Sequence, residues 1–597
     1  MGTGNPIKHL AQGQGVWNLT WAGLLVEELT RLGVRHFVLA PGSRSTPLAL
    51  AVAANKLALA TVHIDERGAA YFALGLARAT RQAVAVISTS GTAAGNFLPA
   101  VMEASNDAIG LIVLTADRPP EKHGVGANQT IAQEGMFADY ARGQINLPVP
   151  DDQYPLTELL AAIDQGYYAA TGDNPGPVHF NCPFRKPLVP APADCVDLNW
   201  PGGLPRSWRE GRHPYSAPPP HQPKCSAEAL RTLVGAVTST EQGLVVIGHL
   251  PRGEQQSAAA RLADHLGWPV VADITSGLRL GRRLHNRVGY FDYICASGHA
   301  DVIPAPLTVL HLGGRIVSQQ VLEFAKRPRV TRYLMVNNPH VIFDPEKAVT
   351  ERINSDIEGI VDGLCDMLPQ KPPTPPAKTL LAASARATAA VNDHLRTMAT
   401  VSEPDVARVV SEGIRADGAV FLASSMPVRD MNLFAVGDGP EVPVGCNRGV
   451  SGIDGTVASA IGFGNGHRCP ITVVTGDLAL LHDLNSLALV RHSQQPITII
   501  VINNNGGGIF SFLPIEEHHE VFESFFGVPH ELTFKSFCKP FDLDYFSPQT
   551  PAEFRDTYTR SQEKHNHTLI EVTTDRAANL ALHRHLQQLA IEAIANA

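Results

Sequence analysis

The chain has 597 residues, of which 44% are hydrophobic and 18% charged, and its formal net charge is −9 at pH 7. A chain of this length exceeds what one hydrophobic core supports, so we expect about two to four globular domains. The negative charge and the scattered lysines and arginines give no electrostatic support for a nucleic-acid partner. No run of about 18 apolar residues occurs, so we expect no membrane partner.

The cysteine pattern and the N-terminus indicate a cytoplasmic protein. The eight cysteines lie far apart without a C-x-x-C pair, which indicates neither a zinc site nor a disulfide framework. Residues 1–15 lack the apolar core of a signal peptide. We therefore expect reduced thiols and a cytoplasmic location.

Strand and helix patterns alternate through the first part of the chain. Residues 17–33 predict a helix, and short apolar runs predict strands at 37–39, 61–64, 84–87 and 111–115. Polar segments follow these strands, with sequences APGSRSTP at 40–47, DERG at 65–68 and STSGTAAGN at 88–96. This alternation predicts a parallel α/β domain.

Two of these junctions are candidates for binding. The loop at 40–47 opens a helix, and such a start is either an anion site or an ordinary capping loop. Arg44 in this loop favours the anion site. Glu66 lies between a strand and a helix expected from residue 69, where an acid is more often a cap that complements the helix dipole.

Proline-rich segments divide the rest of the chain. Linkers expected at 196–223 and 368–376 flank a second α/β unit with strands at 244–247, 269–272, 307–312 and 332–336. A third unit begins near residue 379, with strands at 419–423, 471–474, 497–502 and 568–572. We predict an α/β protein of three doubly wound parallel-sheet domains, at 1–200, 224–370 and 378–597.

The most informative stretch is residues 471–510. One strand ends in Gly476-Asp477, an amphipathic segment follows at 480–490, and the next strand ends in Asn503-Asn504-Asn505 before three glycines. Because the carboxyl ends of adjacent parallel strands meet at one sheet edge, Asp477 and Asn504 are expected close together. A carboxylate, an amide oxygen and a glycine carbonyl suit Mg²⁺ or Ca²⁺ with phosphate. Either turn alone is more often a simple strand-end turn.

Two common nucleotide-binding motifs are missing from the sequence. It has no G-x-x-x-x-G-K-[ST], so a P-loop is not supported. It also has no G-x-G-x-x-G after a predicted strand, so a Rossmann dinucleotide site and an NAD-linked enzyme are not supported.

The spaced Gly-Asp and Asn-Asn pair resembles the diphosphate-binding motif of thiamine-diphosphate enzymes, with Leu478 where a small residue is usual. Several further segments resemble one family, the 2-succinyl-5-enolpyruvyl-6-hydroxy-3-cyclohexene-1-carboxylate synthases of menaquinone and phylloquinone biosynthesis, whose members also carry Gly-Asp-Leu. These segments are APGSRSTPLALA at 40–51, DERGAAYFALGLA at 65–77, STSGTAAGNFLPAVMEAS at 88–105, TADRPPE at 115–121, GANQTI at 126–131, NRGVSGIDGT at 447–456 and NNNGGGIFSFLP at 503–514. The resemblance is dense in both outer domains and weak in the middle one.

The resemblance implies a reaction and a cofactor. The reaction is decarboxylation of 2-oxoglutarate and conjugate addition of the resulting carbanion to isochorismate. Thiamine diphosphate would be held through Mg²⁺ or Mn²⁺ by Asp477, Asn504 and the Gly506 carbonyl. Glu66 would activate the aminopyrimidine ring, and its apolar neighbours at 69–72 predict a buried carboxyl group. The three domains would be pyrimidine-binding, central and diphosphate-binding, with active sites shared between subunits of a homodimer or homotetramer.

The resemblance also implies which residues contact the cofactor and the substrates. Gln129 is carried over as catalytic, and Ser425, Ile453 and Leu478 as cofactor contacts, with Ile453 as an apolar wedge. Both substrates are dicarboxylates, which guanidinium groups bind well, although one arginine alone is more often a surface residue. The substrate-binding positions are Ser43, Arg44, Arg118, Asn128, Gln129, Arg429, Arg448, Ile509, Phe510 and Leu513.

One departure and two alternatives stay open. Gln319-Gln320 stands where many family members carry a basic pair, so we assign no substrate role there. The nearest alternative is another thiamine-diphosphate carboligase or 2-oxoacid decarboxylase, against which the several arginines argue. A non-enzymatic thiamine-diphosphate-binding protein is the other, against which Glu66, Asp477 and Asn504 argue. The sequence does not distinguish menaquinone from phylloquinone, nor a dimer from a tetramer.

Overall fold

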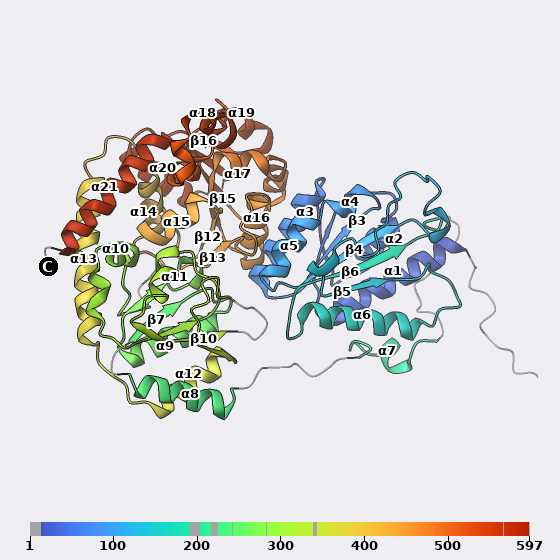
Figure 1. Cartoon of the computed structure of the whole chain (residues 1–597). Helices are drawn as coiled ribbons and strands as arrows, with labels where there is room; N and C mark the ends of the chain where they lie inside the picture. Colours follow the sequence, from blue (N-terminus) through green and yellow to red (C-terminus); the bar gives the residue numbers. More distant parts are fainter. Residues whose placement is uncertain are drawn as a thin grey trace, which may run out of the picture. The chain divides into compact units, whose positions relative to one another are not determined.

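Figure 1 shows a computed structural model of the chain, which describes residues 13–190, 203–216, 225–240, 243–281, 283–337, 343–564 and 566–595. The contacts divide the chain into two compact units. Unit 1 consists of Met1–His221, Asn447–His467 and Asp483–His492. Unit 2 consists of Gln222–Cys446, Arg468–His482 and Ser493–Ala597.

Unit 1 is built on a six-stranded parallel sheet in the order β2-β1-β3-β4-β6-β5. The four strands predicted from the sequence are present, although the second lies two residues earlier than predicted, at Leu59–Val62, and β5 and β6 extend the sheet. The sequence pattern missed β5 because it is a half-exposed edge strand, and β6 because prolines stand at both of its ends. The strands are β1 (His36–Leu39), β2 (Leu59–Val62), β3 (Val84–Ser88), β4 (Leu111–Asp117), β5 (Gly143–Asn146) and β6 (Pro177–Pro183).

Helices cover both faces of the unit 1 sheet (Figure 1). On one face, α1 (Gln14–Arg31), α2 (Thr46–Ala54) and α6 (Leu156–Thr171) bury a shared apolar core against the strands. On the other face lie α3 (Glu66–Thr80) and α5 (Leu98–Asn106), with the short α4 (Thr92–Gly95) between β3 and α5. The helices α2, α3 and α4 are the elements that follow β1, β2 and β3, so the polar junctions seen in the sequence lie at the carboxyl edge of the sheet.

A later segment of the chain, α16 (Thr456–His467), packs along α3 within unit 1. Glycines make this packing close. A Cβ atom at Gly75 of α3 would lie 2.0 Å from the Ser459 carbonyl oxygen, and one at Gly462 of α16 would lie 2.2 Å from the Phe72 carbonyl oxygen. The two helices therefore touch backbone to backbone at these glycines.

The first expected linker contains an ordered helix, α7 (Arg206–Glu210). Trp208 is buried, its indole nitrogen donates to the Glu28 carboxylate, and the Arg31 guanidinium lies 3.8 Å from its ring centre. The prediction of a plain linker was wrong for these residues because one aromatic side chain anchors them to unit 1 despite the surrounding prolines. Linker residues 196–202 and 217–223 lie outside the described residues.

Unit 2 carries two parallel sheets, in the orders β11-β10-β9-β7-β8 and β13-β12-β14-β15-β17-β16. Together with unit 1 they confirm the predicted α/β fold with three parallel sheets. The missed strands β11, β13 and β16 are edge strands of three or four residues. The strands are β7 (Gly243–Ile247), β8 (Val270–Ala272), β9 (Leu307–Leu312), β10 (Val330–Asn337), β11 (Glu351–Asn354), β12 (Ala419–Leu422), β13 (Val444–Cys446), β14 (Ile471–Gly476), β15 (Ile497–Asn503), β16 (Asp544–Phe546) and β17 (Thr568–Thr573).

The two six-stranded sheets have the same strand order, counted along the chain. In each, the order reverses next to the first strand, between β1 and β3 in unit 1 and between β12 and β14 in unit 2. Open α/β sheets bind ligands at this reversal, beyond the carboxyl ends of the strands. The loops that follow β1, β3, β12 and β14 are therefore the expected ligand-binding positions.

The helices of unit 2 fill the faces of its two sheets. The long helices α13 (Pro375–Leu395) and α21 (Arg576–Ala595) lie side by side in Figure 1 and pack together. The remaining helices of eight residues or more are α8 (Ala227–Thr238), α9 (Gly253–Leu266), α12 (Ile357–Met367), α14 (Glu403–Gly413), α15 (Met426–Phe434) and α20 (Pro551–Glu563).

The amphipathic segment after β14 is helical but divided. It forms α17 (Asp477–His482) and the 3₁₀ segment η6 (Leu484–His492). The cysteines within the described ranges are free thiols, as the sequence indicated. Among the helices in the described part of the chain, none is both long and apolar enough to cross a bilayer.

Candidate active site

The loops after β1 and β3 meet at the strand reversal of unit 1. The Arg44 amide donates to Thr89 Oγ1 at 3.2 Å, and the buried Arg44 guanidinium donates to the Phe184 carbonyl at 2.6 Å. Burial lowers the pKa of Arg44, the positive charge of Arg118 lowers it further, and Asp117 acts in the opposite direction. The Nε atoms of Arg44 and Arg118 are buried without a partner among the described residues. Two neighbouring guanidiniums with unused donors suit an anionic ligand.

Gln129 is fastened to the turn that follows β3. The Gln129 side-chain Nε2 donates to the Ser90 backbone carbonyl at 2.8 Å, and the Gln129 backbone carbonyl accepts from Ser90 Oγ at 2.9 Å. Gly91 in this turn has φ +83°, and a Cβ there would lie 2.9 Å from Gln129 Cγ, so a glycine is needed. Ser43 and Asn128, which directly precede Arg44 and Gln129 in the sequence, are both exposed.

Glu66 is the first residue of α3, but it does not cap the helix. The cap is Asp65, whose carboxylate accepts from the Arg67 amide at 3.0 Å. Glu66 is partly exposed, whereas the apolar residues at 69–72 are buried. The expectation of a buried Glu66 was wrong for this chain because α3 directs its apolar face into the core and leaves its first turn at the sheet edge.

The loop at 447–455 is bound to α3 and α5 within unit 1. The Gly449 and Val450 amides each donate to the Glu103 carboxylate at 2.7 Å. The Tyr71 hydroxyl donates to Asp454 at 2.6 Å. The loop therefore has a defined position next to the helix that begins with Glu66.

This loop carries the candidate residues Arg448 and Ile453. Arg448 is partly buried, and the Ile453 side chain is 36% exposed. The Glu103 that holds the loop is almost fully buried, and burial and the nearby Asp107 raise its pKa to about 7, although Arg78 at 3.5 Å opposes the shift.

In unit 2, Asp477 and the glycine turn meet at the carboxyl ends of β14 and β15. Asp477 is 2% exposed, and its carboxylate accepts from the Gly506 amide at 2.9 Å and from the Leu478 amide at 2.6 Å. Gly506 has φ +134°, and a Cβ there would lie 1.8 Å from the Gly527 carbonyl oxygen. The fold thus brings together two of the three expected metal ligands.

Asn504 presents an unused oxygen at the same edge. Its Nδ2 donates to Glu403 Oε1 at 3.1 Å, while its buried Oδ1 has no partner among the described residues. A carboxylate, an unpaired amide oxygen and a glycine carbonyl form a hard oxygen donor set, which fits a divalent cation bound to a diphosphate. Within the described ranges, no group of three or more His, Cys, Asp or Glu side chains could hold a metal, so a site with one carboxylate is the strongest metal candidate.

His530 is a neighbour of Asp477 that the sequence analysis missed. Its Nε2 lies 3.1 Å from Asp477 Oδ2, and its Nδ1 accepts from the Leu532 amide at 3.0 Å. Because Nδ1 is an acceptor, the proton is on Nε2 and His530 donates to Asp477. His530 follows an irregular π-helical turn, Glu523–Gly527, and no sequence period marks such a position.

Glu403 is a second residue that the sequence analysis missed. It is fully buried, and burial and the nearby Asp430 raise its pKa to about 7. The sequence around Glu403 does mark the start of α14, because Ser402 and Asp405 on either side of it form a reciprocal capping box. That signal gives the helix start but not the partner of Glu403.

Ser425 and Arg429 lie at the start of α15, directly after β12. Ser425 has φ +72° and ψ −134°, a conformation that is costly for a residue with a side chain and is often found at functional sites. Arg429 is exposed and donates to the Ser425 carbonyl. The two residues therefore occupy the unit 2 loop at the strand reversal.

The apolar candidates follow the glycine turn in the 3₁₀ segment η7 (Gly508–Phe512). Ile509 and Phe510 are partly buried, and Phe510 packs against Phe526 with ring centres 5.5 Å apart. Leu513 is 48% exposed.

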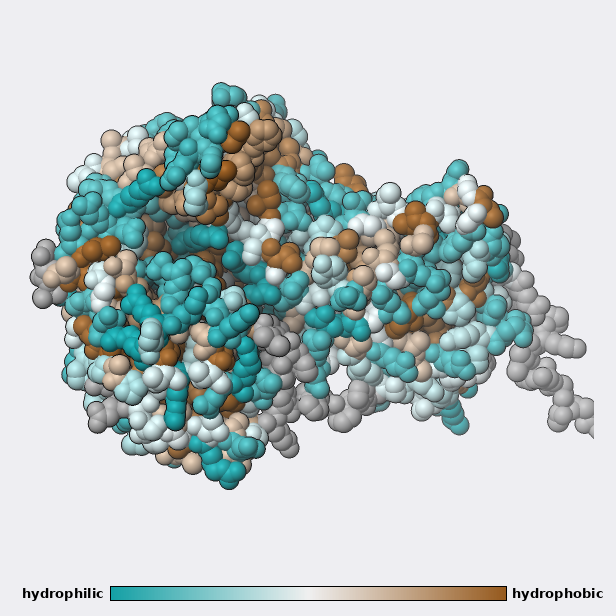
Figure 2. Space-filling view, viewed as in Figure 1, coloured by the Kyte–Doolittle hydropathy of each residue, from teal (hydrophilic) through white to brown (hydrophobic). Residues whose placement is uncertain are grey.

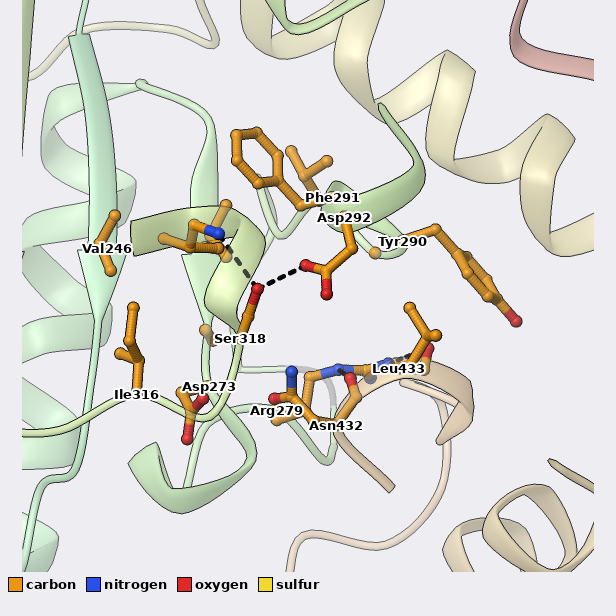
Figure 3. Close-up of a pocket in the computed structure, with 15 residues that line it drawn as sticks. Val246, Asp273, Arg279, Tyr290, Phe291, Asp292, Ile316, Ser318, Asn432 and Leu433 are labelled. Atoms are coloured by element: carbon orange, nitrogen blue, oxygen red, sulfur yellow. Dashed lines mark hydrogen bonds between the residues drawn. The ribbon is translucent and has the colours of Figure 1, made fainter. Parts of the chain in front are cut away.

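A cavity in unit 2 lies between the five-stranded sheet, at β7 and β8, and α15 (Figure 3). Its volume of about 30 Å³ holds one or two water molecules, which is too small for a cofactor. In its wall, Arg279 donates to the Asn432 and Leu433 carbonyls at 3.1 and 3.3 Å. The segment after β8 is thus hydrogen-bonded to the last turn of α15, the helix whose first turn carries Arg429.

Gln319 and Gln320 are exposed at the start of α11 (Gln319–Ala325). Ser318 caps this helix, and Gln319 donates to Glu346 at 3.3 Å. The contacts of Gln319 are those of a surface residue.

Known protein families match all three sheet regions. Residues 19–136 match the "Thiamine pyrophosphate enzyme, N-terminal TPP binding domain", and residues 446–572 match the corresponding "C-terminal TPP binding domain". Residues 200–422 match the "Middle domain of thiamine pyrophosphate". The matches follow the order of the domains along the chain.

Curated proteins named 2-succinyl-5-enolpyruvyl-6-hydroxy-3-cyclohexene-1-carboxylate synthase are similar over nearly the whole chain. The protein from Rubrobacter xylanophilus is 45% identical, covering 95% of this chain and 98% of the relative. Those from Salinibacter ruber and Chlorobium phaeovibrioides are 41% and 38% identical, each covering 95% of this chain and 95% and 96% of the relative. The chain therefore belongs to the thiamine pyrophosphate enzymes and, within them, to the family of 2-succinyl-5-enolpyruvyl-6-hydroxy-3-cyclohexene-1-carboxylate synthases.

Proposed function

We propose that the protein is a transferase that decarboxylates 2-oxoglutarate and joins the remaining four-carbon unit to isochorismate, releasing CO₂ and 2-succinyl-5-enolpyruvyl-6-hydroxy-3-cyclohexene-1-carboxylate. Its place is in menaquinone or phylloquinone biosynthesis. The similarity to synthases of this name over nearly the whole chain carries the proposal. The paired Arg44 and Arg118 support it, because both substrates bear two carboxylates.

Thiamine diphosphate, when bound, supplies the electron sink for decarboxylation and carbon–carbon bond formation. We assign its Mg²⁺ or Mn²⁺ to the Asp477 carboxylate, Asn504 Oδ1 and the Gly506 carbonyl. The bond between the Gly506 amide and Asp477 supports this set, as does the unpaired Asn504 oxygen. Leu478 directly follows Asp477 in the sequence, and Ser425 lies on the loop after β12, the strand that pairs with β14; both are assigned to the cofactor.

Glu66 has the role of holding and exchanging a proton with the aminopyrimidine ring of the cofactor. Asp65 already caps α3, so the Glu66 carboxyl group is available for that hydrogen bond. Gln129, fixed by Ser90, is assigned to orient the reacting groups. Ile453, partly exposed on its anchored loop, is assigned as an apolar support for the cofactor.

The substrate carboxylates are assigned to the arginines. Arg44 and Arg118, with Ser43 and Asn128, form one anion-binding group in unit 1. Arg429 in unit 2 and Arg448 in unit 1 supply further guanidiniums. The apolar side of the isochorismate pocket is assigned to Ile509, Phe510 and Leu513.

We assign a cytoplasmic homodimer or homotetramer to the active form. Exposed apolar side chains lie on the edge strand β2 and two residues beyond it, with Leu59 52%, Val62 56% and Ile64 73% exposed. Unit 2 carries others, among them Phe525 at 73%, and Figure 2 shows brown hydrophobic groups on its surface. A second copy would remove such surfaces from water. Light scattering at assay concentration tests this, and a fully active monomer would refute it.

The reaction is tested directly with purified protein, thiamine diphosphate, Mg²⁺, 2-oxoglutarate and isochorismate. The loss of isochorismate absorbance should require all five components. The Asp477→Ala variant is the control and should lose activity together with Mg²⁺-dependent cofactor binding. If isochorismate is consumed equally without 2-oxoglutarate, the proposed reaction is wrong.

A further inference from the structure

The asparagine assigned to the metal is held by a buried glutamate from a distant helix. Glu403 begins α14 and is 1% exposed, and it lies 101 residues from Asn504 in the sequence. Its Oε1 accepts from Asn504 Nδ2 at 3.1 Å and from the Thr574 hydroxyl at 3.2 Å. The proposed reaction assigns no role to Glu403 or to Thr574.

This contact decides which end of the Asn504 amide is available. A primary amide has one oxygen acceptor and one nitrogen donor, and rotation by 180° exchanges them. Glu403 Oε1 also accepts from the Thr574 hydroxyl, so this oxygen acts as an acceptor, binds the nitrogen end of Asn504 and leaves Oδ1 without a partner among the described residues. The reversed amide would place two oxygens against each other and offer an NH₂ group, which cannot bind a cation.

We propose that Glu403 is a positioning residue that fixes the Asn504 amide so that Oδ1 is offered to the metal ion. This inference rests on the metal assignment made above. Partners that orient metal ligands through a second hydrogen bond are a general feature of metal sites, and their loss typically weakens metal binding about 10- to 100-fold.

Glu403 is itself well fixed for this role. The Ser402 and Asp405 capping box sets the first turn of α14, where Glu403 is the first helical residue. Thr574 holds the same carboxylate oxygen from the segment after β17. The orientation of Asn504 is thus determined by α14 and by the end of a neighbouring strand.

A second buried pair in unit 2 provides a matched control. Glu571 is also 1% exposed, and it accepts from Nδ2 of the adjacent Asn503 at 2.6 Å. Glu571 also accepts from the Phe534 amide at 3.0 Å and from the Tyr545 hydroxyl at 2.7 Å, which makes it a structural group. Both glutamates are buried and each accepts from the side chain of an asparagine, but only Glu403 contacts an assigned metal ligand.

The test measures the Mg²⁺ concentration that half-saturates thiamine-diphosphate binding, by calorimetry on metal-stripped full-length protein. Glu403→Gln retains an oxygen that accepts from Asn504 and should stay within about 3-fold of wild type. Glu403→Met removes the acceptor and should raise the half-saturating concentration about 10- to 100-fold. Glu571→Met should lower the melting temperature without a comparable change in the Mg²⁺ requirement. A folded Glu403→Met protein with the wild-type Mg²⁺ requirement, or equal losses in the two Met variants, would overturn the proposal.

A second pair of variants keeps the proposal testable if Glu403→Met does not fold. Asn504→Asp places a carboxylate against Glu403, so it should weaken Mg²⁺-dependent binding. Adding Glu403→Gln supplies a donor to that carboxylate and should recover most of the loss, and no recovery would overturn the proposal. If wild-type protein binds the cofactor equally with and without Mg²⁺, the metal assignment itself is wrong and the positioning role with it. If the wild-type protein requires Mg²⁺ for cofactor binding, the metal assignment stands, and a failure of the variants then refutes only the positioning role of Glu403.

Discussion

Replacing Gly75 by alanine tests how closely α3 and α16 must pack. The new Cβ would lie 2.0 Å from the Ser459 carbonyl oxygen, well under the 3.0 Å that real Cβ contacts respect. The clashing atom is backbone, so no side chain can rotate away and the helices must separate by about 1 Å. The reciprocal contact of Gly462 with the Phe72 carbonyl makes the same interface tight from the other side.

The magnitude follows from the cost of overpacking. A forced fit of this kind costs about 1–3 kcal/mol, which corresponds to a melting temperature lower by about 2–12 °C for a unit of this size. Alanine gains up to about 1 kcal/mol over glycine in an open helix, which opposes the loss. A Cβ added at Gly235 in α8 would have no atom within 4 Å, so Gly235→Ala measures that gain alone and should raise stability slightly.

Differential scanning calorimetry of both variants gives the comparison, and the activity assay adds a functional result. α3 begins with Glu66, and α16 follows the loop that carries Ile453, so separating the helices should also lower kcat/KM. A Gly75→Ala protein that melts no lower than Gly235→Ala and retains full activity would show that this helix contact has neither the tightness nor the role given to it.

Three further predictions concern single groups. Glu66→Gln should retain cofactor binding and lose turnover by orders of magnitude, whereas Asp65→Ala should lose about 1 kcal/mol of stability with little change in turnover; the reverse pattern would make Glu66 structural. Because burial raises the folded-state pKa of Glu103 from 4.5 to about 7, its contribution to stability is present at low pH and is lost as the pH rises through about 7. Denaturant unfolding at about pH 5 and about pH 8 should therefore show a larger loss in wild type than in Glu103→Gln, and equal losses would contradict the assignment. Arg429→Lys and Arg448→Lys should each lower kcat/KM about 10- to 150-fold without changing cofactor affinity, because lysine cannot reproduce a two-pronged contact. Wild-type kinetics in both would make these arginines structural.

The sequence predicted the parts of the molecule that depend on local patterns. Buried strands such as β9 and β15 were found because their apolar runs are long and end in turn residues. The carboxyl ends of the neighbouring strands β14 and β15 placed Asp477 beside the glycine turn, as the bond between Asp477 and the Gly506 amide confirms. The missed edge strands β11, β13 and β16 are too short for a period to emerge.

Contacts between distant segments were beyond sequence reasoning. Glu403 lies 101 residues from Asn504, and His530 lies 53 residues from Asp477, without a shared pattern in either case. Asp65 and Glu66 are adjacent acids, and only the backbone geometry shows which of them caps α3. The influence of Arg118 on Arg44 likewise depends on two loops that meet only in the folded sheet.

The most direct test of the proposed function is the stoichiometry of the two half-reactions. In a reaction with 2-oxoglutarate labelled in every carbon, one CO₂ should be released for each isochorismate consumed, and four labelled carbons should appear in the product by mass spectrometry. CO₂ release that continues without isochorismate consumption, or a product without the four labelled carbons, would identify a simple decarboxylase or a different carboligase and contradict the proposed function.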